Sequence, residues 1–177
     1  MRHLDLFSGI GGFALAARWC GMETIAFSEV DKYAIKVLEK NFPGVPNLGD
    51  ITKSETWPDL GRIDLLTGGF PCQPFSCAGK RRGKEDDRHL WPAMCAVVQR
   101  YRPAWVLGEN VPGIIPMELD GVLSDLEGLG YTCQTFVIPA CAVDARHRRN
   151  RIWVVANNDS ERCNWESVSV RERQEKD

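Results

Sequence analysis

Short apolar runs alternate with helical stretches over most of the chain, and this alternation limits the fold more than any other feature of the sequence. Extended runs are predicted at residues 2–7, 23–28, 45–48, 62–67, 104–107, 131–138 and 150–156, and helices at 12–20, 31–41, 89–101 and 114–129. Strands that alternate with helices favour an α/β fold with a mostly parallel sheet. The last two runs have no helix between them, so we expect an antiparallel hairpin at one edge.

The composition is that of one globular domain. The chain has 177 residues, of which 44% are hydrophobic and 26% charged. No apolar run approaches the roughly 20 residues that span a bilayer, so no membrane partner is expected. The seven cysteines form no CxxC pair, so no metal site is expected either. Free thiols without a secretion signal indicate the reducing cytoplasm.

The character of the sequence changes near Asn157. Residues 157–177 are mostly polar and contain few apolar groups. Such a segment cannot bury enough apolar surface to hold one conformation. We therefore expect a folded domain over residues 1–156 and a poorly ordered tail over residues 157–177.

A glycine-rich turn connects the first predicted strand to the first predicted helix. Gly9, Gly11 and Gly12 lie in this turn, where glycine lets the backbone approach a ligand and the helix N-terminus favours a negative group. Glu29 ends the second strand, where a carboxylate can accept hydrogen bonds from ribose hydroxyls. The spacing differs from G-x-G-x-x-G, which disfavours a nicotinamide cofactor. The pattern predicts a nucleoside-containing cofactor, and the alternative is a tight turn beside a surface glutamate.

Cys72 lies in a loop that follows the predicted strand at 62–67. Pro71 and Pro74 restrict the backbone on both sides of Cys72. Ligands of doubly wound sheets bind outside the carboxyl ends of the strands, so a thiol held there suits a nucleophile. A lone cysteine is more often a buried structural residue, but its position after paired glycines favours the catalytic interpretation.

Basic residues gather in two places, although the net charge of the chain is −2. One cluster covers residues 80–84 and the other residues 146–151. The total charge does not indicate nucleic-acid binding, and charge clusters of this size are usually solvated loops. Their positions, one after Cys72 and one before the last strand, leave open a contact with phosphate groups.

Four segments, in this order along the chain, resemble motifs of the DNA (cytosine-5)-methyltransferase family. They are residues 5–13 (DLFSGIGGF), 69–76 (GFPCQPFS), 109–111 (ENV) and 149–151 (RNR). The family has Gln at the position of His147. The resemblance implies a Rossmann-like fold that uses S-adenosyl-L-methionine to methylate carbon 5 of cytosine in double-stranded DNA, in restriction–modification or in phage or host DNA modification.

The resemblance also implies a role for each catalytic residue. The Cys72 thiolate would attack carbon 6 of cytosine, which makes carbon 5 nucleophilic enough to take a methyl group. Glu109 would hydrogen-bond or protonate N3, and Arg151 would bind O2 with support from Arg149. The target base would have to leave the duplex.

Further contacts follow from the same resemblance. The implied cofactor contacts are Phe7, Gly9, Gly11, Gly12, Glu29, Val30, Asp50, Ile51, Pro71 and Leu90. The implied DNA contacts are Gln73, Ser76, Lys80, Arg81 and Arg82.

The family continues after the Arg-rich turn with a target-recognition region and a final motif, neither of which is found in this chain. We therefore expect a fragment, a degenerate gene, or a split enzyme that needs a second chain. Two other functions stay open from the sequence: a non-catalytic remnant that binds cofactor or partner chains, and a methyltransferase that acts on cytosine in tRNA.

Overall fold

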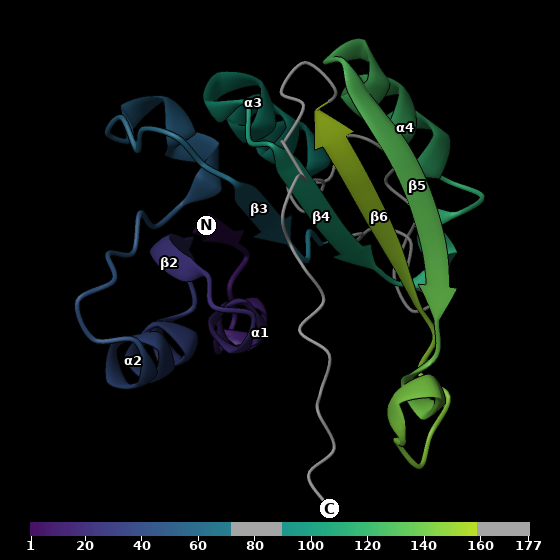
Figure 1. Ribbon diagram of the computed structural model, residues 1–177, viewed down its shortest axis with the longest axis horizontal. Helices are drawn as coiled ribbons and strands as arrows, with labels where there is room; N and C mark the ends of the chain where they lie inside the picture. The colour runs from purple at the N-terminus through teal and green to yellow at the C-terminus, as the bar shows by residue number, and fades with distance from the viewer. Residues whose placement is uncertain (72–89, 159–177) are drawn as a thin grey trace, which may run out of the picture.

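A single twisted sheet forms the centre of the molecule (Figure 1). The computed structural model describes residues 1–71 and 90–158, and within them the sheet has six strands in the order β2-β1-β3-β4-β6-β5. The strands are β1 (Arg2–Leu6), β2 (Glu23–Ser28), β3 (Leu65–Gly68), β4 (Trp105–Asn110), β5 (Tyr131–Ile138) and β6 (Arg151–Asn158).

The first four strands run parallel, β6 runs against them, and β5 runs in the direction of the first four. β1 pairs in parallel with β2 and with β3, and β3 pairs in parallel with β4. β6 lies antiparallel between β4 and β5, which form its two neighbours. The expected α/β sheet with an antiparallel hairpin at one edge is confirmed.

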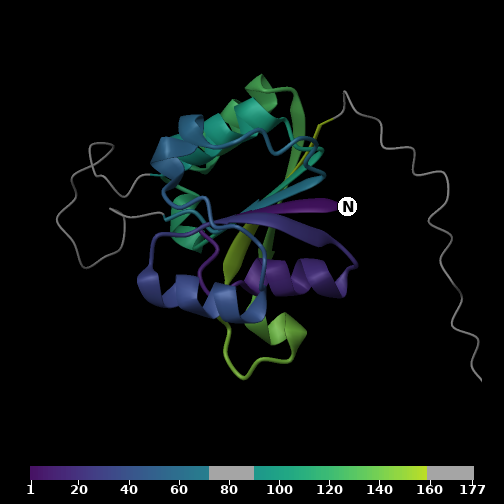
Figure 2. The ribbon, with the colours of Figure 1, turned by 90° about the vertical axis from the view of Figure 1, so that its left-hand side faces the viewer.

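Helices cover both faces of the sheet, as Figure 2 shows. The helices are α1 (Gly12–Trp19), α2 (Lys32–Asn41), α3 (Trp91–Tyr101) and α4 (Leu119–Gly128), and the 3₁₀ turns are η1 (Ile51–Thr56), η3 (Pro112–Ile114) and η4 (Ala140–Val143). α1 and α2 pack on one face, whereas η1, α3 and α4 pack on the other. The main buried cluster joins the sheet to η1, α3 and α4, and a smaller cluster of Ala14, Phe27 and Leu38 joins it to α1 and α2.

The glycine turn fixes how closely α1 approaches α2. Gly11 has a φ of 90°, and a Cβ placed there would lie 2.7 Å from Cε2 of Phe42 and 2.9 Å from Cδ2 of Leu38. A larger residue would therefore be strained in its backbone and would also collide with two side chains of the neighbouring segment. Asp31, expected to cap α2, does so by accepting from the backbone amides of Tyr33 and Ala34.

Two predicted elements differ from the structure. The strand expected at 45–48 is wrong, because only a single parallel bridge between Phe27 and Asn47 forms there. The helix expected at 114–129 is split into η3 and α4, since Pro116 has no amide hydrogen to continue the ladder. In the tail expected at 157–177, the first two residues belong to β6, and residues 159–177 lie outside the described part. Across residues 1–71 and 90–158, no helix is long and apolar enough to cross a membrane.

Candidate active site

A cavity of about 230 Å³ opens at the carboxyl ends of β1 and β2. Its lining residues are Phe7, Ser28, Glu29, Val30, Gly49, Asp50, Ile51, Pro71 and Leu90. Seven of these nine are among the residues that the sequence assigns to the cofactor; Ser28 and Gly49 are additions. The structure thus brings together residues from five separate parts of the chain, and their contact with a cofactor stays a prediction.

Glu29 is held in one orientation by three backbone amides. Its Oε2 accepts from the N–H of Gly9 at 2.7 Å, and its Oε1 accepts from the N–H groups of Val30 and Asp31, each at 2.8 Å. A carboxylate offers about four lone-pair sites, so roughly one remains for a hydroxyl donor such as a ribose O–H. The carboxylate of Glu29 is therefore already oriented before a ligand binds.

The glycines of the turn do not line the cavity themselves. Gly9 reaches it only through its hydrogen bond to Glu29. Gly11 precedes α1 as its N-cap, and Gly12 is the first residue of that helix. Phe7 does line the cavity, and its φ of 52° is a costly conformation for a residue with a side chain. This unusual backbone lets the turn leave β1 at the edge of the cavity.

Asp50 supplies a second carboxylate to the lining of the cavity. Its Oδ1 accepts from the hydroxyl of Thr52 at 2.8 Å and from the N–H of Thr52 at 2.9 Å. The hydroxyl bond and then the amide bond lower the pKa of Asp50, so the group is ionised near neutral pH. An ionised carboxylate can accept from an exocyclic amine, which is the role expected for Asp50.

Glu109 and Arg151 form an ion pair at the same edge of the sheet. Nε of Arg151 lies 2.7 Å from Oε1 of Glu109, and the two side chains are only 21% and 26% exposed. Glu109 pairs with Trp153 across the β4–β6 ladder, which places Arg151 on the same face, two residues further along. Of the two arginines expected to act, Arg151 contacts Glu109, whereas Arg149 is exposed on the preceding turn with a φ of 36°.

The chain that leaves β3 passes beside this pair. A Cβ on Gly69 would lie 3.4 Å from Oε2 of Glu109, so the backbone runs close to the carboxylate. Asn110 donates from Nδ2 to the carbonyl of Phe70 at 2.9 Å and fixes the segment in place. The sequence assigned no role to Asn110, although its position beside Glu109 in the ENV segment pointed to the site. Cys72 follows two residues after Phe70 and lies outside the described residues, as do the expected DNA contacts Gln73, Ser76, Lys80, Arg81 and Arg82.

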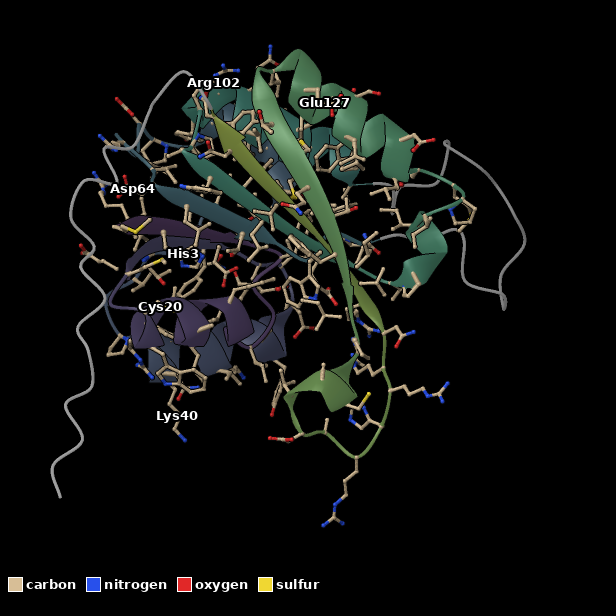
Figure 3. All side chains as sticks on the ribbon, turned by 45° about the vertical axis from the view of Figure 1, so that its right-hand side comes forward. His3, Cys20, Lys40, Asp64, Arg102 and Glu127 are labelled. Carbon is tan, nitrogen blue, oxygen red and sulfur yellow. The ribbon has the colours of Figure 1, made fainter. Side chains whose placement is uncertain are left out.

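A buried chain of hydrogen bonds connects β1, β2 and β3 and starts at His3, which is labelled in Figure 3. Nδ1 of His3 is 2.9 Å from Oγ1 of Thr24, and Nε2 is 2.8 Å from Oγ1 of Thr67, which in turn donates to Oδ1 of Asp5 at 2.8 Å. Because the Thr67 hydroxyl donates to Asp5, it accepts from Nε2–H, and the Thr24 hydroxyl donates to Nδ1. Burial raises the pKa of Asp5 to about 7 and lowers the pKa of His3 to about 4.

The fold and the cavity define a class of α/β proteins that bind a nucleoside-containing ligand at the carboxyl ends of parallel strands. The family model described as C-5 cytosine-specific DNA methylase matches residues 1–177. The chain belongs to this family.

Curated relatives and solved structures agree with the family match. Type II methyltransferase M.HhaI of Haemophilus parahaemolyticus is 38% identical over 162 residues, which cover 88% of this chain and 48% of that relative. For M.HgiBI of Herpetosiphon aurantiacus the identity is 37%, covering 87% of this chain and 36% of that relative. This chain therefore spans half or less of the length of these relatives.

A DNA modification methyltransferase encoded within an E. coli prophage superposes with a TM-score of 0.75 at 27% identity, covering 90% of this chain and 47% of that one. The S. pombe Dnmt2 methyltransferase superposes with a TM-score of 0.71 at 21% identity, covering 89% and 50%. At that identity the second likeness concerns the fold alone. The Rossmann-like methyltransferase fold expected from the sequence is confirmed.

Proposed function

We propose that this chain transfers a methyl group from S-adenosyl-L-methionine to carbon 5 of cytosine in double-stranded DNA, with Cys72 as the nucleophile. One observation carries the proposal. The segment Gly69–Pro71 touches both halves of the site, because Gly69 borders the Glu109–Arg151 pair and Pro71 lines the cavity. Cys72 is the next residue in the sequence, so the candidate nucleophile follows directly from the point where the two halves meet.

The ion pair suits the pyrimidine edge that changes charge during the attack. When a thiolate adds to carbon 6, negative charge builds on N3 and O2 of the ring. Glu109, once protonated, donates to N3, and the Arg151 guanidinium donates to O2. The ion pair holds these two groups side by side, as the neighbouring ring atoms require. Arg149 completes the proposed catalytic set from the preceding turn.

The cavity fits an adenosine-containing group by its donor and acceptor chemistry. Bound S-adenosyl-L-methionine supplies an electrophilic methyl group. Glu29 would hold the ribose, Asp50 would accept from the adenine amine, and Val30 and Ile51 would contact the ring faces. Phe7, Pro71 and Leu90 would complete the wall, and the turn with Gly9, Gly11 and Gly12 would carry the methionine part.

The proposal extends to partners and location. Its substrate is DNA, contacted by Gln73, Ser76, Lys80, Arg81 and Arg82. The family carries its target-recognition region outside the stretch that this chain matches, and either a further part of a longer protein or a second polypeptide would supply it. Residues 1–156 would form the catalytic domain, residues 157–177 a poorly ordered tail, and the protein would act in the cytoplasm.

A covalent trap tests the nucleophile. Duplex DNA with 5-fluorocytosine stalls the reaction, because fluorine cannot leave carbon 5 as a proton does. With a family C-terminal half supplied in trans, the wild type and Cys141→Ala, which alters another exposed thiol, should form a stable adduct, whereas Cys72→Ala should form none. An adduct that survives Cys72→Ala would rule out the assignment. An adduct on fluorinated tRNA but not on DNA would reject the DNA substrate.

A further inference from the structure

Asn47 joins the two segments that carry Glu29 and Asp50, although it does not line the cavity itself. Its Oδ1 accepts from the N–H of Glu29 at 3.0 Å and from the N–H of Gly49 at 3.2 Å. Its Nδ2 donates to the carbonyl of Glu29 at 3.0 Å. The side-chain amide of Asn47 thus contacts the backbone of two residues that line the cavity, Glu29 and Gly49.

The Asn47 side chain continues the hydrogen bonding beside β2 where the backbone pairing stops. The N–H of Phe27 donates to the carbonyl of Pro46, and the N–H of Leu48 donates to the carbonyl of Phe27, which makes a single parallel bridge beside β2. The next backbone groups that face this segment belong to Glu29, directly after β2, because those of Ser28 face the opposite side. The N–H and the carbonyl of Glu29 both bind the Asn47 amide, which presents an acceptor and a donor as a neighbouring peptide group would.

The third hydrogen bond, from the N–H of Gly49, orients the segment that leads into Asp50. Gly49 has a φ of 74°, and the turn that it makes leads directly into Asp50. Ser28 adds a bond from its hydroxyl to the carbonyl of Gly49 at 2.7 Å. The spacing between the carboxylates of Glu29 and Asp50 therefore depends on a short bridge between two loops.

We propose that Asn47 is a positioning residue for the adenosine part of the cofactor, acting through the backbone of Glu29 and Gly49. The inference rests on the proposed function. Asparagine suits the position because its amide provides both a donor and an acceptor. Aspartate would keep the two bonds to Oδ1 but would lose the donor and would place a negative charge against the carbonyl of Glu29. Glutamine carries one more methylene, which moves the amide out of register.

Calorimetric titration of the 177-residue chain with S-adenosyl-L-methionine and with adenosine tests the proposal. Asn47→Ala should raise both dissociation constants by the same factor, roughly tenfold, because the affected wall holds only the adenosine part. Asn47→Asp should fall between the wild type and Asn47→Ala. Asn41→Ala, an exposed asparagine at the end of α2, is the matched control and should bind like the wild type.

A thermodynamic cycle separates positioning from general loss of structure. If Asn47 acts partly through Glu29, then Asn47→Ala should weaken cofactor affinity by clearly less than tenfold in a Glu29→Ala background, and the effect that remains comes through Gly49 and Asp50. An undiminished tenfold effect there would overturn the route through Glu29. A loss of adenosine binding much smaller than the loss of cofactor binding would also overturn the proposal.

Amide hydrogen exchange measured without ligand tests the Asn47 bridge independently of the proposed function. In Asn47→Ala the amides of Glu29 and Gly49 should exchange faster, whereas the amide of Leu48, which bonds to Phe27, should not change. Unchanged exchange at Glu29 and Gly49 would refute the bridge whatever the ligand. Failure of the wild type to bind the cofactor at all would instead refute the proposed function and, with it, the positioning role.

Discussion

The buried His3 should make the stability of this protein depend on pH in a predictable way. Burial lowers the pKa of His3 from its usual 6.5 to about 4, so the folded state keeps the ring neutral where the unfolded state protonates it. Between these two values the unfolded state binds one more proton. Stability from this group is therefore complete above pH 6.5 and is lost as the pH falls towards 4, by about 3 kcal/mol in total.

Asp5 acts in the opposite direction. Burial raises its pKa from 3.8 to about 7, so the folded state holds the extra proton and its contribution is lost as the pH rises through 7. Between pH 4 and 6.5 the two groups should nearly cancel, because each contributes about 1.4 kcal/mol per pH unit with opposite sign. The wild type should therefore hide both effects, and removing one group should reveal the other.

His3→Gln is the informative change, since glutamine can bond to hydroxyls but does not titrate. We expect urea unfolding of both proteins from pH 4 to 8 to give a difference in free energy of unfolding, variant minus wild type, that rises by about 3 kcal/mol as the pH falls from 7 to 4. Any fixed cost of repacking shifts this difference equally at every pH. A difference that stays flat across the range would show that His3 titrates normally and that the buried chain does not hold it neutral.

Three further outcomes can be measured. Glu29→Ala should weaken S-adenosyl-L-methionine binding at least tenfold, and calorimetry showing unchanged affinity, or tighter binding of a nicotinamide dinucleotide, would contradict the assignment of the cavity. Gly11→Ala should lower the melting temperature more than Gly21→Ala, because both have positive φ but only Gly11 would meet Phe42; equal losses would remove the steric argument. The 177-residue chain alone should not methylate duplex DNA at a useful rate, and several unaided turnovers per hour would contradict this. Adding a family C-terminal half should raise the activity, and it should also raise the melting temperature because it would cover the exposed apolar residues 136–138.

The family resemblance supplied most of the residues expected around the cavity, and strand-end position by itself pointed only to Glu29 and the glycine turn. Phe7, Glu29 and Pro71 each follow a strand, or end one, in a parallel part of the sheet, so their positions in the chain place them at one edge. The Glu109–Arg151 pair was expected only from motif resemblance. Its contact depends on β6 lying next to β4, and strand order between distant segments cannot be read from local periodicity.

The sequence did not predict two sets of side-chain hydrogen bonds, those of the Asn47 amide and those between His3 and Asp5. Residues 45–48 were predicted as a strand from their apolar character, but only one bridge forms and the Asn47 amide takes the place of the next. The chain from His3 to Asp5 was equally hidden. Its members sit on three different strands and look like ordinary strand residues until the strand order brings their polar atoms into contact.

The reversed direction of β6 sets a minimum length for anything that completes the site from beyond it. Arg151 begins β6 beside Glu109, whereas Asn158 ends it beside Ala104, at the opposite end of the same ladder. The eight residues of β6 make seven steps of roughly 3.4 Å, which separate its two ends by about 24 Å. A polypeptide that continues from Asn158 and returns to the catalytic edge therefore needs at least about seven residues if extended, or about 16 if helical, before it can place a side chain near the reacting base.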